Sequence, residues 1–182
     1  VVGKEIDKDD LERLLSEAEV GKLVEKIYGL LNVRLRSERE IRTYLKQLSF
    51  KRKVKELDEL SEIVIEALVE KLKKRDLIND LRFAKEWVEA RRRSKKKGIN
   101  ALKSELFQKG INREIIDEVL SSEIGDSEEV LAKQALEKKL RIWKNLPEME
   151  FKQKSIRFLM SRGFNYDIAK QVVENSLKED YN

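Results

Sequence analysis

Two segments of this chain end in the same way, and this ending is the strongest constraint on its fold. In Leu106–Ile111 and in Leu159–Phe164, a large apolar residue is followed four positions later by Gly and five positions later by a second large apolar residue. A helix that ends in a Schellman turn has this spacing, because Gly takes the left-handed position and the next residue packs back on the helix. An earlier segment, Leu45–Phe50, has the same apolar spacing with Ser49 in place of Gly. The chain is therefore predicted to repeat a helical unit that ends at each of these positions.

The composition favours an all-α fold built from small modules. The 182 residues include one Pro and seven Gly, and 41% are charged while only 7% are aromatic. So much charge with so few aromatic residues leaves little material for a large core, and the scarcity of Pro and Gly leaves few helix breaks. Both properties are typical of stacked helical repeats, in which each unit completes the core of the next. We predict an elongated, curved array of three three-helix repeats over residues 20–78, 79–123 and 124–182, after a charged helical extension over residues 1–19. One compact helical bundle, with accidental similarity between its turns, is the alternative.

Several classes of function are disfavoured by the residues that the chain lacks. It has no Cys and no His, which excludes zinc fingers, thiol chemistry and catalytic triads that depend on His. No Gly-rich phosphate loop and no EF-hand spacing is present. We therefore expect no enzymatic activity, no catalytic residue, no cofactor and no metal site.

The chain has no signal for membrane insertion or secretion. No stretch of about 18 apolar residues occurs, and residues 1–10 lack the apolar region of a signal peptide. The first residue is Val1, which leaves open whether the natural start lies upstream. We expect a cytoplasmic protein that does not enter a membrane.

The positive charge of the chain is concentrated in its middle. The net charge is +5, but residues 81–110 alone carry +7. Six cations fall within seven positions, followed by two more on the next predicted helix: Arg91, Arg92, Arg93, Lys95, Lys96 and Lys97, then Lys103 and Lys109. Two or three cations would suffice to complement a helix dipole, so we interpret the run as a site for phosphates or carboxylates. A solvated helix end is the alternative.

A second group of cations precedes and enters the helix predicted from Ser37. It consists of Arg34, Arg36, Arg39, Arg42 and Lys46. The last three are spaced i, i+3 and i+7, which places them on one helix face. A binding surface and a solvated face are equally open here. Arg162 lies in the last turn before Gly163, where the helix dipole alone explains it.

Trp87 and Trp143 raise the question of base stacking. Trp87 shares a predicted helix face with Phe83 and Ala90, so we expect it in the core. Trp143 follows a charged stretch, and we expect it to be core with partial exposure.

The order of these motifs resembles the RecX family of regulatory proteins. The resemblance rests on Arg34–Ile41, on Leu77–Ala84 followed by Trp87 and the basic run to Gly98, on Glu105–Ile111 and on Phe158–Phe164. It covers about residues 20–175. The chain departs from the family pattern at Ser49, where Gly is expected, and at Leu48, where a basic residue is expected. Ser in a left-handed position would cost on the order of 1 kcal/mol, so the first repeat is expected to close differently.

The resemblance implies a function that composition and spacing do not show. RecX proteins are built from tandem three-helix repeats, have no catalytic activity, and bind the RecA recombinase and its DNA filament. They usually suppress filament extension, ATP hydrolysis and strand exchange, and so belong to homologous recombination, DNA repair and the SOS response. We expect a monomer that binds a RecA-type recombinase and, weakly and with salt sensitivity, single- and double-stranded DNA. A direct DNA-binding protein resembling a helix-turn-helix and a helical scaffold for another protein are the alternatives.

Overall fold

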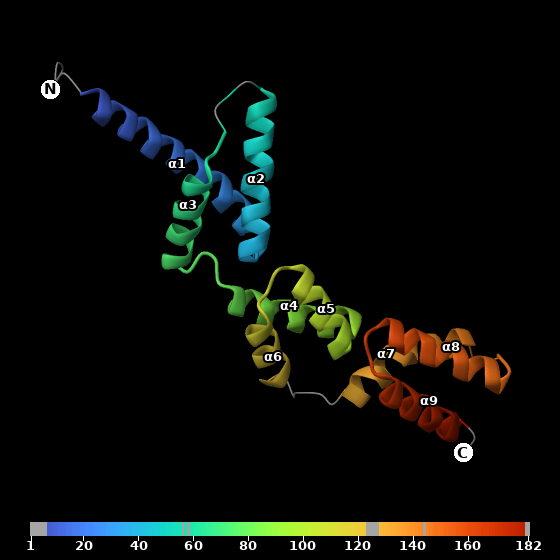
Figure 1. Cartoon of the computed structure of the whole chain (residues 1–182). Helices are drawn as coiled ribbons and strands as arrows, with labels where there is room; N and C mark the ends of the chain where they lie inside the picture. The colour runs from blue at the N-terminus through green and yellow to red at the C-terminus, as the bar shows by residue number, and fades with distance from the viewer. Residues whose placement is uncertain (1–6, 56, 58, 123–127, 144, 181–182) are drawn as a thin grey trace. The chain divides into compact units, whose positions relative to one another are not determined.

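The computed structural model describes residues 7–55, 57, 59–122, 128–143 and 145–180, without the side chains of residues 8–19, 122, 179 and 180. Over these ranges it contains nine α-helices and no strand (Figure 1), which confirms the all-α class. The helices are α1 (Lys8–Val33), α2 (Glu38–Val54), α3 (Glu62–Lys74), α4 (Asp80–Lys95), α5 (Ile99–Gln108), α6 (Arg113–Ser122), α7 (Glu128–Trp143), α8 (Glu148–Ser161) and α9 (Tyr166–Asp180). None of them, as far as the chain is described, is long and apolar enough to cross a bilayer.

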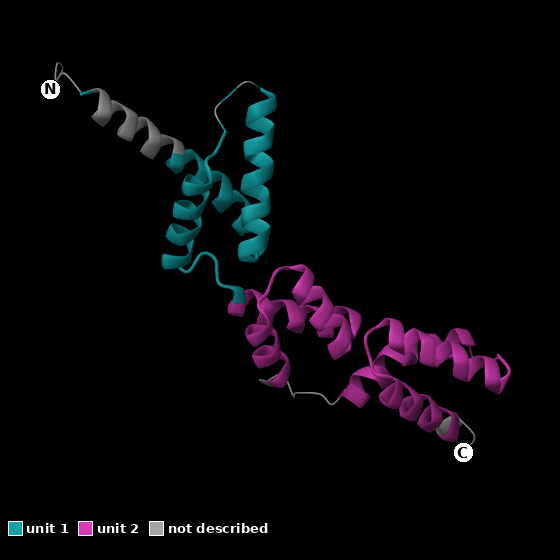
Figure 2. Ribbon diagram, viewed as in Figure 1, with its two compact units in different colours: residues 1–80 teal, residues 81–182 magenta. Residues whose placement is uncertain are grey.

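The chain divides into two compact units (Figure 2). Unit 1 is residues 1–80 and unit 2 is residues 81–182. Unit 1 contains the helices of the predicted extension and first repeat, and α1 continues without a break through residues 19 and 20. Unit 2 contains both the second and the third group of three helices. The elongated, curved arrangement and the exact repeat boundaries stay predictions.

The core of unit 1 is formed by three helices, with α3 in contact with both α1 and α2. Its buried apolar side chains are Leu23, Ile27, Ile41, Leu45, Leu60, Ile65, Leu68, Val69, Leu72 and Ile78. Ser37 starts α2 as predicted, because its hydroxyl oxygen accepts a hydrogen bond from the Glu40 backbone N–H at 3.2 Å. This cap fixes the point at which the chain turns from α1 into α2.

The prediction that a helix ends at Ser49 is wrong. α2 continues to Val54, and Ser49 lies buried inside it. The Ser49 hydroxyl accepts a hydrogen bond from the Leu60 N–H at 2.9 Å, so it ties α2 to the segment before α3. Phe50, which would pack back on the helix in a Schellman turn, is instead 66% exposed. Without Gly, a left-handed residue is costly at this position, and the helix continues through it.

The two Gly-ended helices are as predicted. Gly110 and Gly163 have φ angles of 80° and 92°. In α5, the N–H of Ile111 donates to the carbonyl of Leu106 at 3.1 Å, and in α8 the N–H of Phe164 donates to the carbonyl of Leu159 at 3.2 Å. Both are the long hydrogen bond of a Schellman motif.

A short backbone contact joins the two helix groups of unit 2. Gly98 N–H donates to the carbonyl of Arg162 at 2.9 Å, and Asn100 N–H donates to the carbonyl of Gly163 at 3.1 Å. A Cβ atom on Gly98 would lie 2.6 Å from the carbonyl carbon and oxygen of Gly163, and one on Gly163 would collide with Ala101. The contact therefore requires Gly on both sides.

An acidic residue at the start of a later helix caps an earlier one, and this occurs twice. The Asp80 carboxylate accepts from the Glu38 N–H at 2.8 Å, within unit 1, and the Glu128 carboxylate accepts from the Ile99 N–H at 3.1 Å, within unit 2. Asp80 and Glu128 begin α4 and α7, while Glu38 and Ile99 begin α2 and α5. The second helix of one three-helix group is thus capped by the first helix of the next.

Candidate nucleic-acid and protein interface

The cations of the basic run at the end of α4 contact different partners. Arg91 donates through Nε to Glu105 at 2.8 Å, and its guanidinium lies 4.2 Å from the centroid of the Trp87 ring. The Trp87 Nε1–H donates to the same carboxylate at 2.9 Å, and Lys97 Nζ lies 3.6 Å from its other oxygen. Glu105 therefore gathers two cations of the basic run and the indole N–H of Trp87. Arg91 and Lys97 contribute to the packing of α4 against α5.

Arg92 is largely enclosed. Its side chain is 11% exposed and lies 3.7 Å from the Glu128 carboxylate, which is itself 15% exposed. Burial raises the pKa of Glu128 above its ordinary value, against the lowering effects of the Ile99 N–H and of Arg92. Arg92 thus belongs to the junction between α4 and α7, where a diffusing ligand has little access.

The raised pKa of Glu128 predicts how its replacement by Gln depends on pH. Between the ordinary value of 4.5 and the raised folded value, folded protein binds more protons than unfolded protein, so the free energy of unfolding falls as pH rises. Glu128→Gln removes this cost and keeps an oxygen for the Ile99 N–H. The stability of the variant relative to wild type should therefore rise with pH across that window.

Urea unfolding followed by Trp emission at several pH values checks this. Both Trp residues lie in unit 2, so the signal reports that unit alone. Glu129→Gln, at an exposed neighbouring position, is the control. Its stability relative to wild type at each pH gives the general effect of one charge fewer in the first turn of α7, and this value is subtracted from that of Glu128→Gln. A relative stability that falls with pH would contradict the assignment.

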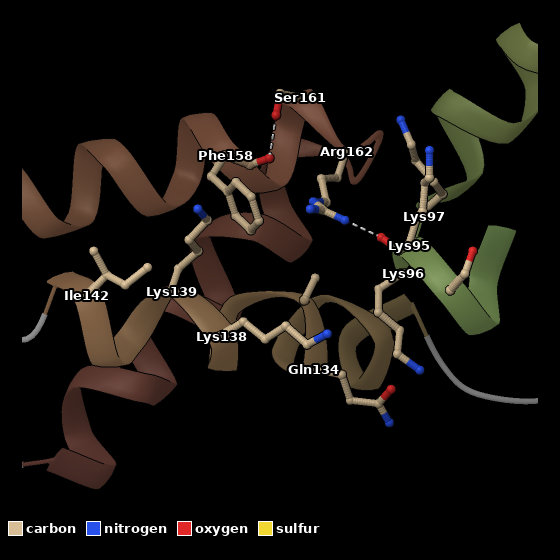
Figure 3. A pocket seen from close by; sticks show the side chains of 12 residues that line it. Lys95, Lys96, Lys97, Gln134, Lys138, Lys139, Ile142, Phe158, Ser161 and Arg162 are labelled. Atoms are coloured by element: carbon tan, nitrogen blue, oxygen red, sulfur yellow. Dashed lines mark hydrogen bonds between the residues drawn. The ribbon is translucent and has the colours of Figure 1, made fainter.

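Three predicted cations come together with three that were not predicted. Lys95, Lys96 and Lys97 line a pocket of 730 Å³ (Figure 3), and Lys138, Lys139 and Arg162 line its other sides from α7 and the end of α8. The positive φ of 48° at Lys96 turns the chain out of α4 at this point. Arg93 is 78% exposed and has a long contact of 3.8 Å with Glu89. Within the basic run, the two exposed cations are thus Lys95, in the pocket lining, and Arg93, close to it along the chain.

The missed residues carried only weak signals in the sequence. Lys138 and Lys139 are adjacent in a helix rich in both signs of charge, and Gln134, Lys138 and Ile142 follow at i, i+4 and i+8 on one face. Arg162 was assigned to the helix dipole. Tertiary packing brings α7 and the end of α8 to the end of α4, and the spacing of residues along the chain does not specify this packing.

Lys103 and Lys109 lie away from this pocket lining. Lys103 Nζ lies 2.8 Å from Asp117 on α6, and the pKa of that carboxyl is lowered, chiefly by the hydrogen bond from Lys103. Lys109 Nζ lies 5.0 Å from the Trp87 centroid. Trp87 is half-buried and engaged by cations, while Trp143 is half-buried against Phe158 in an edge-on arrangement.

The second predicted group, in unit 1, is largely ion-paired. Arg34 forms a two-point pair with Glu40, and Arg42 bridges Glu38 and Glu66 at 2.7 Å each. Lys46 lies 3.2 Å from Glu62. The pairs of Arg42 with Glu66 and of Lys46 with Glu62 connect α2 with α3, so much of the group has a structural role. Arg39 is exposed, and Arg36 is half-buried.

Family models match the second half of the chain. The model for the second three-helix domain of RecX matches residues 79–120, and the model for its third three-helix domain matches residues 127–173. The matched ranges contain the basic run, the pocket lining and both Gly-ended helices.

Curated relatives and solved structures bear the same name. A protein of Finegoldia magna named "Regulatory protein RecX" is 33% identical over 92% of this chain and 78% of its own length. One of Listeria innocua is 30% identical over 97% of this chain, which spans 62% of that protein. A crystal structure of regulatory protein RecX has a TM-score of 0.77 over 94% of this chain and 80% of the other, at 24% identity. RecX from Lactobacillus salivarius has a TM-score of 0.72 over 87% and 97%, at 23% identity. At these identities the two structures show the fold.

Proposed function

Because the chain belongs to the RecX family of regulatory proteins, we propose that it binds a RecA-type recombinase and its DNA filament and inhibits filament extension, ATP hydrolysis and strand exchange. In this role it is a cytoplasmic, monomeric regulator without enzymatic activity. Family membership carries the proposal, and the relatives are named as regulatory proteins. The accessible cations of unit 2 support it, because a DNA filament presents a dense row of phosphates.

The mechanism that fits these observations is attachment of helical repeats along the filament. Each three-helix group supplies a few exposed cations, so one contact is weak. Several contacts on one chain reinforce each other through effective concentration. A regulator held in this way blocks the motions or the subunit addition on which filament growth depends.

The proposal is tested by titrating the protein into a RecA-type recombinase assembled on single-stranded DNA while ATP hydrolysis is followed. We expect hydrolysis to fall as the protein is added. Unchanged hydrolysis, together with sequence-specific binding to bare duplex, would favour the helix-turn-helix alternative. Unchanged hydrolysis without DNA binding would favour the scaffold.

A double variant locates the contact. Arg93→Ala with Lys95→Ala removes two exposed cations that make little contribution to folding, unlike Arg91 and Arg92. We expect several-fold more of the variant to be needed for half-inhibition. Arg157→Ala with Lys170→Ala is the matched control, since both residues are exposed and lie on α8 and α9. Equal inhibition by both double variants would count against this surface.

A further inference from the structure

The pocket at the end of α4 is lined by several cations, and of its described lining residues Lys97 is the one paired with a carboxylate, that of Glu105. None of its described lining residues is acidic. Lys95, Lys96, Lys138, Lys139 and Arg162 form no ion pair with any carboxylate in the described part of the chain. This distinguishes them from Arg91, Arg92 and the ion-paired cations of unit 1, which are Arg34, Arg42 and Lys46. Like charges around one recess repel each other, and a bound polyanion relieves the repulsion.

Arg162 is held ready for an anion. Its guanidinium lies 4.8 Å from the centroid of the Phe158 ring and donates one hydrogen bond to the Lys95 carbonyl. Lys139 Nζ lies 5.7 Å from the same ring, and Figure 3 shows Lys139 and Arg162 on either side of it. A planar guanidinium fixed by stacking keeps its other N–H groups available in a fork that matches phosphate oxygens. The Phe158 ring thus lies between Lys139 and Arg162 and holds the two cations apart in the pocket.

We propose that this pocket binds consecutive backbone phosphates of a single nucleic-acid strand, with Lys96, Lys138, Lys139 and Arg162 as the phosphate-binding residues. The inference deepens the proposed function, on which it rests, by locating the nucleic-acid contact. A concave recess favours a single strand, because a strand can bend into it whereas the phosphates of a duplex lie on a stiff rod. Exposed Ile142 at the pocket adds an apolar surface for a sugar or base, a combination typical of single-strand sites.

The test is fluorescence anisotropy with a labelled oligothymidine of about 16 nucleotides, in the absence of recombinase. The variant is Lys138→Gln with Lys139→Gln, which keeps most of each aliphatic stem. Each lost phosphate contact lowers the slope of log K against log salt by about 0.7, so the slope should fall by about 1.4. Taking equal affinity of the variant and wild type at 1 M salt, a slope difference of 1.4 over one decade makes the variant bind about 25-fold more weakly at 0.1 M salt.

A control and a gain-of-binding variant keep the result interpretable. Lys154→Gln with Lys170→Gln removes two cations from α8 and α9 outside the pocket and should bind like wild type. Gln134→Lys adds a cation to the pocket lining and should steepen the slope by about 0.7. Circular dichroism of each variant shows whether it is folded. Equal loss in the pocket variant and the control, or no gain with Gln134→Lys, would overturn the proposal.

Other ligands are separate arms of the same experiment. Displacement of the strand by ATP at equal phosphate concentration would indicate a nucleotide site and overturn the strand assignment. So would equally strong, pocket-dependent binding of a duplex or of a poly-glutamate peptide. If the pocket variant loses strand binding but wild type leaves the recombinase unaffected, the proposed function fails and the pocket stands. If wild type inhibits and the variant binds the strand normally, the pocket fails and the function stands.

Discussion

Gly163→Ala will destabilise unit 2 by about 4 kcal/mol, the sum of two costs. A left-handed φ of 92° costs an L-residue about 1–2 kcal/mol. The added Cβ would also collide with the backbone and side chain of Ala101 at the start of α5, and overpacking of this kind costs about 1–3 kcal/mol. Urea unfolding followed by Trp emission measures the loss, because both Trp residues are in unit 2.

Two further Gly variants separate these costs. Gly98 has a φ of −80°, so Gly98→Ala carries only the steric cost of its approach to Gly163 and should lose about 2 kcal/mol. Gly21→Ala, in α1 with no atom within 4 Å of the added Cβ, should leave the Trp transition unchanged. A Gly98→Ala variant as stable as wild type would show that the backbone contact is not as close as described.

The second large effect is expected from adjacent residues in α5. Leu106 is fully buried and forms the inner side of the Gly-ended turn, whereas its larger neighbour Phe107 is 70% exposed. Leu106→Ala should cost about 2–5 kcal/mol, because it removes buried atoms and leaves a cavity. Phe107→Ala should change stability by about 0.5 kcal/mol or less.

The same Trp emission assay compares the two variants directly. Leu159→Ala and Met160→Ala in α8 are the corresponding pair, with Leu159 buried and Met160 half-exposed. The same ranking in both helices would support a repeated turn. A larger loss for Phe107→Ala than for Leu106→Ala would contradict the burial of this face.

The helix ends that depend on local geometry could be predicted from the sequence. Gly110 and Gly163 end their helices because a left-handed φ and an apolar residue directly after it are specified within six residues. Ser49 shared the apolar spacing but not the conformational freedom, and there the prediction was wrong. Its buried hydroxyl instead bonds the Leu60 backbone, eleven residues later, which no local pattern indicates.

The candidate site was only partly accessible to sequence reasoning. A run of cations marked the end of α4, but Glu105 and Glu128 take up Arg91, Lys97 and Arg92 through contacts that only the folded chain brings about. Lys138 was overlooked, and Arg162 was explained by the helix dipole alone, for the same reason. Both line the same pocket as Lys96, from which they are far apart along the chain.

The caps supplied by Asp80 and Glu128 set an order on biosynthesis. As the chain leaves the ribosome, the first N–H of α2 lacks its carboxylate acceptor and bonds water until residue 80 emerges, and the first N–H of α5 does so until residue 128 emerges. The first and second three-helix modules are therefore each completed by the module translated after them. Swapping modules between related proteins preserves this dependence only where the incoming segment begins with a carboxylate.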